Sequence, residues 1–172
     1  MLLGVVSDTH GQAQHTQRAV RMLESLQVAE VIHCGDIGSL EIAPMFAAWP
    51  THFVFGNVDY DRAELRKAIT AAGLQCHNGF GSLTLAGDRL AVAESDAGGL
   101  IAFLHGDDSQ RLKRTIESGR WQLVCHGHTH VSRLEQIGQT LVLNPGAVYR
   151  ARPHSIAVVE LPALKATIIP LD

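Results

Sequence analysis

Seven side chains that can bind a metal ion occur in five short segments, each of which follows an apolar run. They are Asp8, His10, Asp36, Asn57, His105, His128 and His130. Two carboxylates, one amide oxygen and four imidazoles form a ligand set suited to divalent first-row metals. Seven ligands are too many for one ion that must also keep positions open for substrate and water. They fit two ions about 3.5–4 Å apart that share a carboxylate, as in two-metal hydrolases of phosphate esters.

The local sequence around these residues suits a metal site. In Asp8-Thr9-His10 and His128-Thr129-His130 the two ligands are two residues apart, so both can face one cavity from extended backbone. Glycines flank the ligands and would allow sharp turns and a close approach of the backbone to the metals. These glycines are Gly11, Gly35, Gly56, Gly106 and Gly127.

The ordered series D-x-H, G-D, G-N, H-G and G-H-x-H resembles the calcineurin-like metallophosphoesterase superfamily. It is most similar to the small bacterial and archaeal phosphodiesterase subgroup, to which the retromer subunit of the same fold is related. The resemblance runs from Leu2 to the loop Asn144-Pro145-Gly146 and the strands after it, which is nearly the whole chain. Five motifs in the correct order, each after a strand-like run, make this resemblance specific.

The resemblance implies a definite site. The first metal would be held by Asp8, His10, Asp36 and His130, and the second by Asp36, Asn57, His105 and His128, with Asp36 bridging. Asp36, Asn57 and His128 would be catalytic, and Asn57 would also bind substrate. The implied cofactors are two divalent ions per chain, with Mn²⁺ favoured and Fe, Ni or Zn as alternatives. The implied reaction is hydrolysis of a small phosphodiester by in-line attack of a metal-bridging hydroxide.

Two positions depart from the family pattern. Many relatives have a histidine directly after the asparagine, where it protonates the leaving oxygen, but Val58 stands there in this chain. Relatives often carry a pocket histidine where this chain has Asp107. A missing general acid typically costs about 10²–10⁴ in rate for a poor leaving group. A carboxylate near the site would weaken the attraction of a doubly charged monoester. Both departures favour diesters or activated substrates.

Several residues near these motifs have less definite roles. His126 is expected to support the site without binding metal, and Asp59 could either orient the Asn57 loop or line the pocket. The remaining histidines match no motif and are expected at the surface or at the edge of the core. They are His15, His33, His52, His77 and His154.

Composition restricts the class of protein. The chain has 172 residues, 46% of them hydrophobic, which predicts a single metallophosphoesterase domain over residues 1–172. The net charge is −3 and the 14 basic residues are spread along the chain, which disfavours polymeric nucleic acid as a partner. Three cysteines without a C-x-x-C pair indicate a cytoplasmic protein. No apolar run approaches the roughly 20 residues needed to cross a bilayer.

The hydrophobic pattern predicts alternating strands and helices, followed by an antiparallel C-terminal part. Helices are expected over 12–26, 40–48, 61–72 and 109–117, the third with a capping box at Asp61 and an end at Gly73. Strands are expected over 2–6, 31–34, 52–55, 82–86, 89–94, 100–104, 123–125, 133–137, 139–143, 156–161 and 166–171, with a hairpin turn at Gly87-Asp88. The expected architecture is α/β, a four-layer αββα sandwich of two mixed sheets flanked by helices, which the resemblance also implies.

Two functional hypotheses follow. One is a dinuclear-metal phosphodiesterase acting on a small phosphodiester. The other is a non-catalytic or weakly active protein-binding scaffold of the same fold. A scaffold could lose ligands without penalty, so the presence of all seven favours the enzyme. A phosphomonoesterase acting on proteins is disfavoured by Val58, and the sequence leaves a homo-oligomer open.

Overall fold

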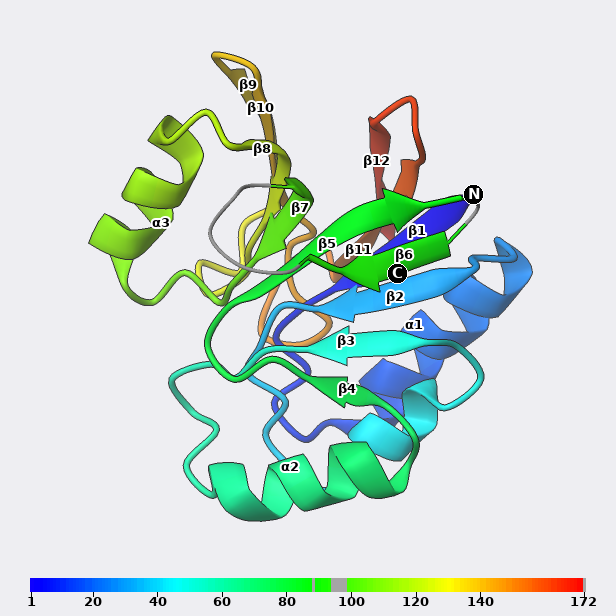
Figure 1. Cartoon of the computed structure of the whole chain (residues 1–172). Helices are drawn as coiled ribbons and strands as arrows, with labels where there is room; N and C mark the ends of the chain where they lie inside the picture. Colours follow the sequence, from blue (N-terminus) through cyan, green and yellow to red (C-terminus); the bar gives the residue numbers. More distant parts are fainter. Residues whose placement is uncertain (88, 94–98, 172) are drawn as a thin grey trace.

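The computed structural model describes residues 1–87, 89–93 and 99–171, which form two mixed six-stranded sheets (Figure 1). The first sheet has the order β12-β11-β1-β2-β3-β4 and the second β6-β5-β7-β8-β10-β9. The strands of the first sheet are β1 (Leu2–Val6), β2 (Glu30–His33), β3 (Thr51–Phe53), β4 (Gln75–Cys76), β11 (Ser155–Glu160) and β12 (Lys165–Pro170). Those of the second are β5 (Gly81–Ala86), β6 (Arg89–Val92), β7 (Gly99–Phe103), β8 (Trp121–Cys125), β9 (Arg133–Ile137) and β10 (Thr140–Asn144).

Each sheet has a parallel centre; the second sheet has two antiparallel edges, whereas the first is antiparallel only at the β12 edge and ends in the parallel strand β4. Strands β1 to β4 pair in parallel, and β11 and β12 add antiparallel strands beside β1. In the second sheet β7, β8 and β10 are parallel, whereas β5, β6 and β9 pair antiparallel. Parallel strands bring their carboxyl ends to the same edge of a sheet, so the loops that follow them can meet there.

Helices cover the outer faces of both sheets, which confirms the expected αββα sandwich. Figure 1 shows α1 (Ala13–Ser25) and α2 (Arg62–Ala71) beside the first sheet and α3 (Ser109–Glu117) beside the second. Successive residues of β1 serve different layers: Leu3 and Val5 pack between the sheets, and Val6 packs in the cluster that contains Leu23 of α1. A strand buried on both faces must be apolar throughout, which explains its unbroken hydrophobic run.

The ends of α2 follow the expected capping rules. The side chain of Asp61 accepts a hydrogen bond from the backbone N–H of Glu64 at 3.2 Å. Gly73 has a φ of +76°, the left-handed conformation that glycine adopts most easily after a helix. In α3 the side chain of Asp108 caps in the same way, accepting from the N–H of Arg111 at 2.9 Å.

The structure differs from the expected elements at two places. The helix expected over residues 40–48 is only a 3₁₀ turn, Ala43–Phe46, because Pro44 lacks the N–H that a longer helix needs. The short strand β4 was not expected, because two residues are too few for a periodic pattern. The hairpin between β5 and β6 is present. Residues 88 and 94–98, which include Asp88 of its turn and the last residue of the strand expected over 89–94, lie outside the described residues.

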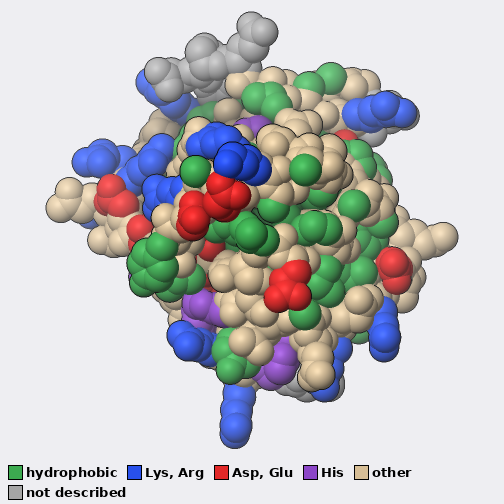
Figure 2. Space-filling model, turned by 90° about the horizontal axis from the view of Figure 1, so that it is seen from below, with side chains coloured by type: hydrophobic (Ala, Val, Ile, Leu, Met, Phe, Trp, Pro, Cys, Tyr) green, Lys and Arg blue, Asp and Glu red, His purple; other side chains and the backbone are tan. Residues whose placement is uncertain are grey.

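The face that carries α2 is shown in Figure 2. Basic and acidic side chains both occur on it, and hydrophobic side chains lie between them, so neither sign of charge covers the whole face. Among the helices that the structure describes, none is both long and apolar enough to cross a membrane.

Candidate metal centre

The seven candidate ligands come from loops that follow β1, β2, β3, β7 and β8, all of them parallel strands. The structure brings all seven together. The β1 loop bonds to the β2 loop through the backbone, with the N–H of Asp8 donating to Gly35 at 3.0 Å and that of His10 to Asp36 at 2.9 Å. The β8 loop joins them where the N–H of His128 donates to Oδ2 of Asp8 at 3.2 Å.

The first half of the cluster contains two carboxylates and two imidazoles. One ligand atom from each of Asp8, His10, Asp36 and His130 lies within 4.8 Å of all the others. Nε2 of His10 lies 3.2 Å from Nε2 of His130, and the latter lies 3.2 Å from Oδ1 of Asp8. These four residues are the ones that the resemblance implies for the first metal.

The second half is built around the amide oxygen of Asn57. Its Oδ1 lies 3.1 Å from Nε2 of His105 and 3.0 Å from Nδ1 of His128. Nε2 of His105 also lies 3.3 Å from Oδ1 of Asp36. The grouping matches the ligand set implied for the second metal.

Asp36 belongs to both halves. Its Oδ1 faces His105 at 3.3 Å, and its Oδ2 faces His10 at 3.7 Å. A carboxylate whose two oxygens point toward two ligand groups has the geometry needed to bridge two ions.

One buried atom tests whether the site fits a metal. Oδ1 of Asp8 is fully buried and forms no hydrogen bond within the described part of the chain, although it lies 3.2 Å from a His130 nitrogen. An unsatisfied buried carboxylate oxygen is costly and calls for an explanation. Two imidazole nitrogens converging beside it form a nitrogen and oxygen donor set that suits a divalent cation. The residues therefore fit the ions implied by the family.

The backbone of the site is held in an unusual conformation. Five of the seven candidate ligands have a positive φ, between 47° and 68°, and these are Asp8, His10, Asp36, His128 and His130. Non-glycine residues seldom adopt this region, and such strain concentrates at functional sites. Gly56 shows how tightly the loops pack, because a Cβ there would collide with Oδ1 of Asp36.

Backbone carbonyls orient two of the imidazoles. Nδ1 of His105 lies 2.8 Å from the carbonyl of Cys34, and Nδ1 of His130 lies 3.3 Å from that of Arg150. When Nδ1–H donates to a carbonyl, Nε2 keeps its lone pair and is free to bind a metal. This is the arrangement that metal-binding histidines commonly show.

Opposing effects set the ionisation of the site. Burial alone would raise the pKa of Asp36, but hydrogen bonds from His105 and from the N–H of Val58 hold that pKa below its usual value. Burial lowers the pKa of His10. The pKa of His105 is raised, because the hydrogen bond and the charge of Asp36 outweigh burial. The pKa of His130 is raised by the Asp8 carboxylate. Protons therefore compete with cations at these two imidazoles as the pH falls.

Two supporting residues were missed or left open by the sequence. His33 was expected at the surface or core edge, but it is fully buried. Its Nε2 lies 3.0 Å from Oγ1 of Thr9, the residue between the candidate ligands Asp8 and His10 in the sequence. Asp59 ties two loops together, accepting from the N–H of Gly38 at 2.9 Å and that of Gly56 at 2.8 Å. It therefore orients the Asn57 loop, one of the two roles considered for it. No sequence signal distinguishes His33 from the other histidines.

Of the other histidines, some lie at the surface or core edge as expected, and one does not. His52 is buried, contrary to the expectation, whereas His15, His77 and His154 are partly exposed. His126 is buried beside the site, where its Nδ1 lies 3.4 Å from Nδ2 of Asn144. Asn144 in turn donates to the carbonyl of Gly127 at 2.9 Å and so supports the His128 loop.

The two departures from the family pattern both border the site. The N–H of Val58 donates to Oδ1 of Asp36 at 3.1 Å, so the side chain of residue 58 starts beside a ligand. Asp107 is exposed and lines a cavity of about 150 Å³ together with His105. The side chain of Val58 offers no proton to a bound ester.

Comparison with known proteins places this chain in one class. Residues 1–163 match the calcineurin-like phosphoesterase superfamily domain. The chain therefore belongs to the calcineurin-like phosphoesterase superfamily, a family of metal-dependent phosphoesterases.

Individual relatives support the same subgroup. A phosphodiesterase of Methanocaldococcus jannaschii is 29% identical over 148 residues, which cover 85% of this chain and 83% of that protein. The structure of an archaeal phosphodiesterase superposes with a TM-score of 0.83 at 25% identity, covering 99% of both chains. Vacuolar protein sorting 29 from Cryptosporidium parvum shares the fold, with a TM-score of 0.63 at 17% identity, covering 98% of this chain and 95% of that one.

Proposed function

We propose that this protein is a dinuclear-metal phosphodiesterase that hydrolyses a small phosphodiester in the cytoplasm, with residues 1–172 acting as one catalytic domain. The observation that carries the proposal is the position of Asp36, whose two carboxylate oxygens face two separate groups of ligands. One ion would be held by Asp8, His10, Asp36 and His130, and the other by Asp36, Asn57, His105 and His128. Mn²⁺ is the favoured metal, and Fe, Ni and Zn suit the same ligands.

The ions, when bound, supply positive charge and a hydroxide nucleophile for attack at phosphorus. The protein supplies position. Two divalent ions and two aspartates together would carry a charge of about +2 when the imidazoles are neutral, and this charge attracts a phosphate ester. Asn57 lies between His105 and His128 at the exposed side of the cluster, where its amide can contact the substrate.

The surroundings of the site favour diesters over monoesters. Val58 supplies no proton to a leaving oxygen, so the rate should depend steeply on leaving-group pKa. Asp107 places a carboxylate at the cavity shared with His105, which opposes a doubly charged monoester more than a singly charged diester. Both residues therefore favour a diester whose leaving group departs without assistance.

A metal-reconstituted protein assayed on matched aryl esters tests the proposal. We expect Mn²⁺-dependent cleavage of bis-p-nitrophenyl phosphate and slower cleavage of p-nitrophenyl phosphate. Metal analysis should find two ions per chain. Faster cleavage of alkyl monoesters would contradict the assignment of Val58. A protein that binds two ions and cleaves neither ester would instead support the scaffold hypothesis.

A further inference from the structure

Helix α3 carries a polar face that the proposed reaction does not use. Arg111, Arg114, Thr115 and Ser118 follow the i, i+3, i+4, i+7 spacing that places side chains on one side of a helix. They border a cavity of about 400 Å³ between α3 and the strands β5 and β8. Its lining also includes Phe80, Ser82 and Trp121.

Arginine is the charged residue type of this cavity. Among the described residues that line it, every charged side chain is an arginine. The guanidinium of Arg111 packs over the ring of Phe80, 5.1 Å from its centroid. Within the part of the chain that the structure describes, neither Arg111 nor Arg114 forms an ion pair, and both side chains are exposed. Two unpaired guanidiniums in a concave site leave strong donors available to an anion.

The arginine cavity adjoins the candidate metal centre. Arg111 also lines the smaller cavity of about 150 Å³ beside His105, where two arginines offset two carboxylates: Arg62, Arg111, Asp107 and Asp108. Arg111 thus stands between the second group of metal ligands and the rest of the arginine cavity. A molecule with one phosphate at the metals could extend past Arg111 and place a second anionic group beside Arg114.

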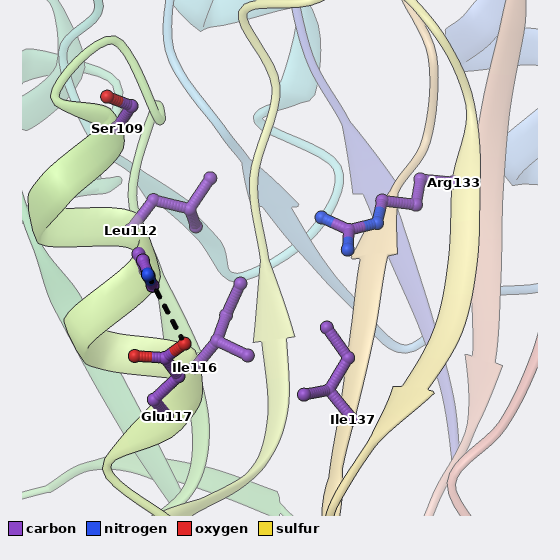
Figure 3. Close-up of a pocket in the computed structure, with 7 residues that line it drawn as sticks. Ser109, Leu112, Ile116, Glu117, Arg133 and Ile137 are labelled. Carbon is purple, nitrogen blue, oxygen red and sulfur yellow. Dashed lines mark ion pairs between the residues drawn. The ribbon is translucent and has the colours of Figure 1, made fainter.

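The opposite side of α3 provides a contrast. A groove of about 240 Å³ lies on that side. In Figure 3, Leu112 and Ile116 of α3 face Ile137 of β9 across it. Its charged groups are paired: Lys113 lies 3.8 Å from Glu117, and Arg133 lies 2.6 Å from Glu135. The two faces of one helix therefore differ, and only the face with Arg111 offers unpaired positive charge to a ligand.

We propose that the Arg111–Arg114 cavity binds a second phosphoryl group of the substrate, which makes the substrate class a phosphodiester that carries an additional phosphate. The proposal rests on the proposed phosphodiesterase function for the position of the first phosphate. Planar guanidinium groups match phosphate oxygens in pairs of hydrogen bonds, which lysines at the same places would not do.

The first test measures binding and needs no metal. Inorganic pyrophosphate is titrated into the EDTA-treated full chain, and binding is followed by calorimetry and by amide NMR shifts. We expect shifts across residues 111–118 and a loss of affinity of about tenfold or more in R111Q/R114Q. R133Q is the matched control, because its arginine is already paired with Glu135. Equal affinity in wild type and R111Q/R114Q, or shifts confined to other residues, would overturn the proposal.

The second test uses two thymidine p-nitrophenyl phosphodiesters that differ only by a second phosphate on the sugar. The wild-type Mn²⁺ enzyme should show a KM about tenfold lower for the diester with the second phosphate. In R111Q/R114Q the ratio of the two KM values should fall to about one, while R133Q should keep the wild-type ratio. A ratio unchanged by R111Q/R114Q would overturn the proposal. Failure to cleave either diester would count against the phosphodiesterase function, and the pyrophosphate titration would still decide on the cavity.

Discussion

The described part of the chain contains two clusters of histidine and carboxylate side chains that differ in how the backbone presents them. The candidate metal centre uses loops after parallel strands, and five of its residues have a positive φ. The second cluster, which we call the inter-strand cluster, consists of Glu30, His52 and His77. None of its three residues has a positive φ, and Glu30 and His52 lie within β2 and β3.

The contacts of the inter-strand cluster run in a chain. Oε2 of Glu30 lies 3.5 Å from Nε2 of His52, and Nδ1 of His52 lies 3.0 Å from Nε2 of His77. The rings of both histidines pack against Phe103. In the metal centre, by contrast, four ligand atoms converge within 4.8 Å, the only such group among the described residues. Residue type alone therefore does not make a metal site; convergence on one point does.

The largest expected effect separates the two clusters by mutation. Asp36→Asn should lose one of two ions and reduce diester hydrolysis by about 10³-fold or more, because one carboxylate serves both ligand groups. Glu30→Gln is the matched carboxylate-to-amide change in the inter-strand cluster and should keep two ions per chain. Metal content and kcat/KM measure both. An Asp36→Asn protein that keeps two ions and full activity would disprove the bridging role.

A smaller effect is expected from a residue that positions ligands without binding metal. Oγ1 of Thr9 lies 3.0 Å from Nε2 of His33 and donates to the carbonyl of Ile37 at 3.1 Å. Thr9→Val removes these bonds and should weaken Mn²⁺ binding about 10–100-fold. Thr9→Ser keeps the hydroxyl and should bind Mn²⁺ as the wild type does. Thr16→Val, at a buried threonine of α1, is the control for general destabilisation. Equal weakening by Thr16→Val would mean that general destabilisation is responsible.

The inter-strand cluster should appear in the pH dependence of stability. Burial lowers the pKa values of both His52 and His77 to about 4. In the unfolded chain a histidine has a pKa of about 6.5. Below that pH the unfolded state binds more protons than the folded state, so the free energy of unfolding falls from about pH 6.5 toward pH 4. His52→Gln should reduce this slope by about 1.4 kcal/mol per pH unit. Urea unfolding of the metal-free wild type and of His52→Gln at several pH values measures this slope. Parallel curves of unfolding free energy against pH for the two proteins would contradict a lowered pKa for His52.

The smallest expected effect concerns chemistry at the edge of the metal centre. Val58→His should raise the rate on alkyl diesters relative to aryl diesters by up to about tenfold, because a proton donor helps poor leaving groups most. Val58→Asn is the control, since it adds a polar group without a titratable proton. Rates on an aryl and an alkyl diester, both with Mn²⁺, provide the ratio. An equal rise for both esters would show that residue 58 does not act on the leaving oxygen.

The sequence by itself indicated the candidate ligand residues and determined the layer architecture. Motifs such as Asp8-Thr9-His10 and His128-Thr129-His130 are local, and strands buried on both faces have an apolar run that can be read directly. The capping of α2 by Asp61 is also local, because the residues that bond are three apart.

Only the tertiary structure decided which other polar residues matter. His33 and His52 lie one register position apart in neighbouring strands, since Ile32 pairs with His52, and their side chains therefore lie on opposite faces of the sheet. His33 bonds to Thr9, and His52 bonds to His77. Arg111 and Arg133 are both arginines in the printed sequence, but only Arg133 finds an acidic partner. The Arg133–Glu135 pair is local, because its residues are two positions apart in β9. The bonds of His33 and His52 join residues 24 and 25 positions apart, and strand pairing creates such contacts only when the chain folds.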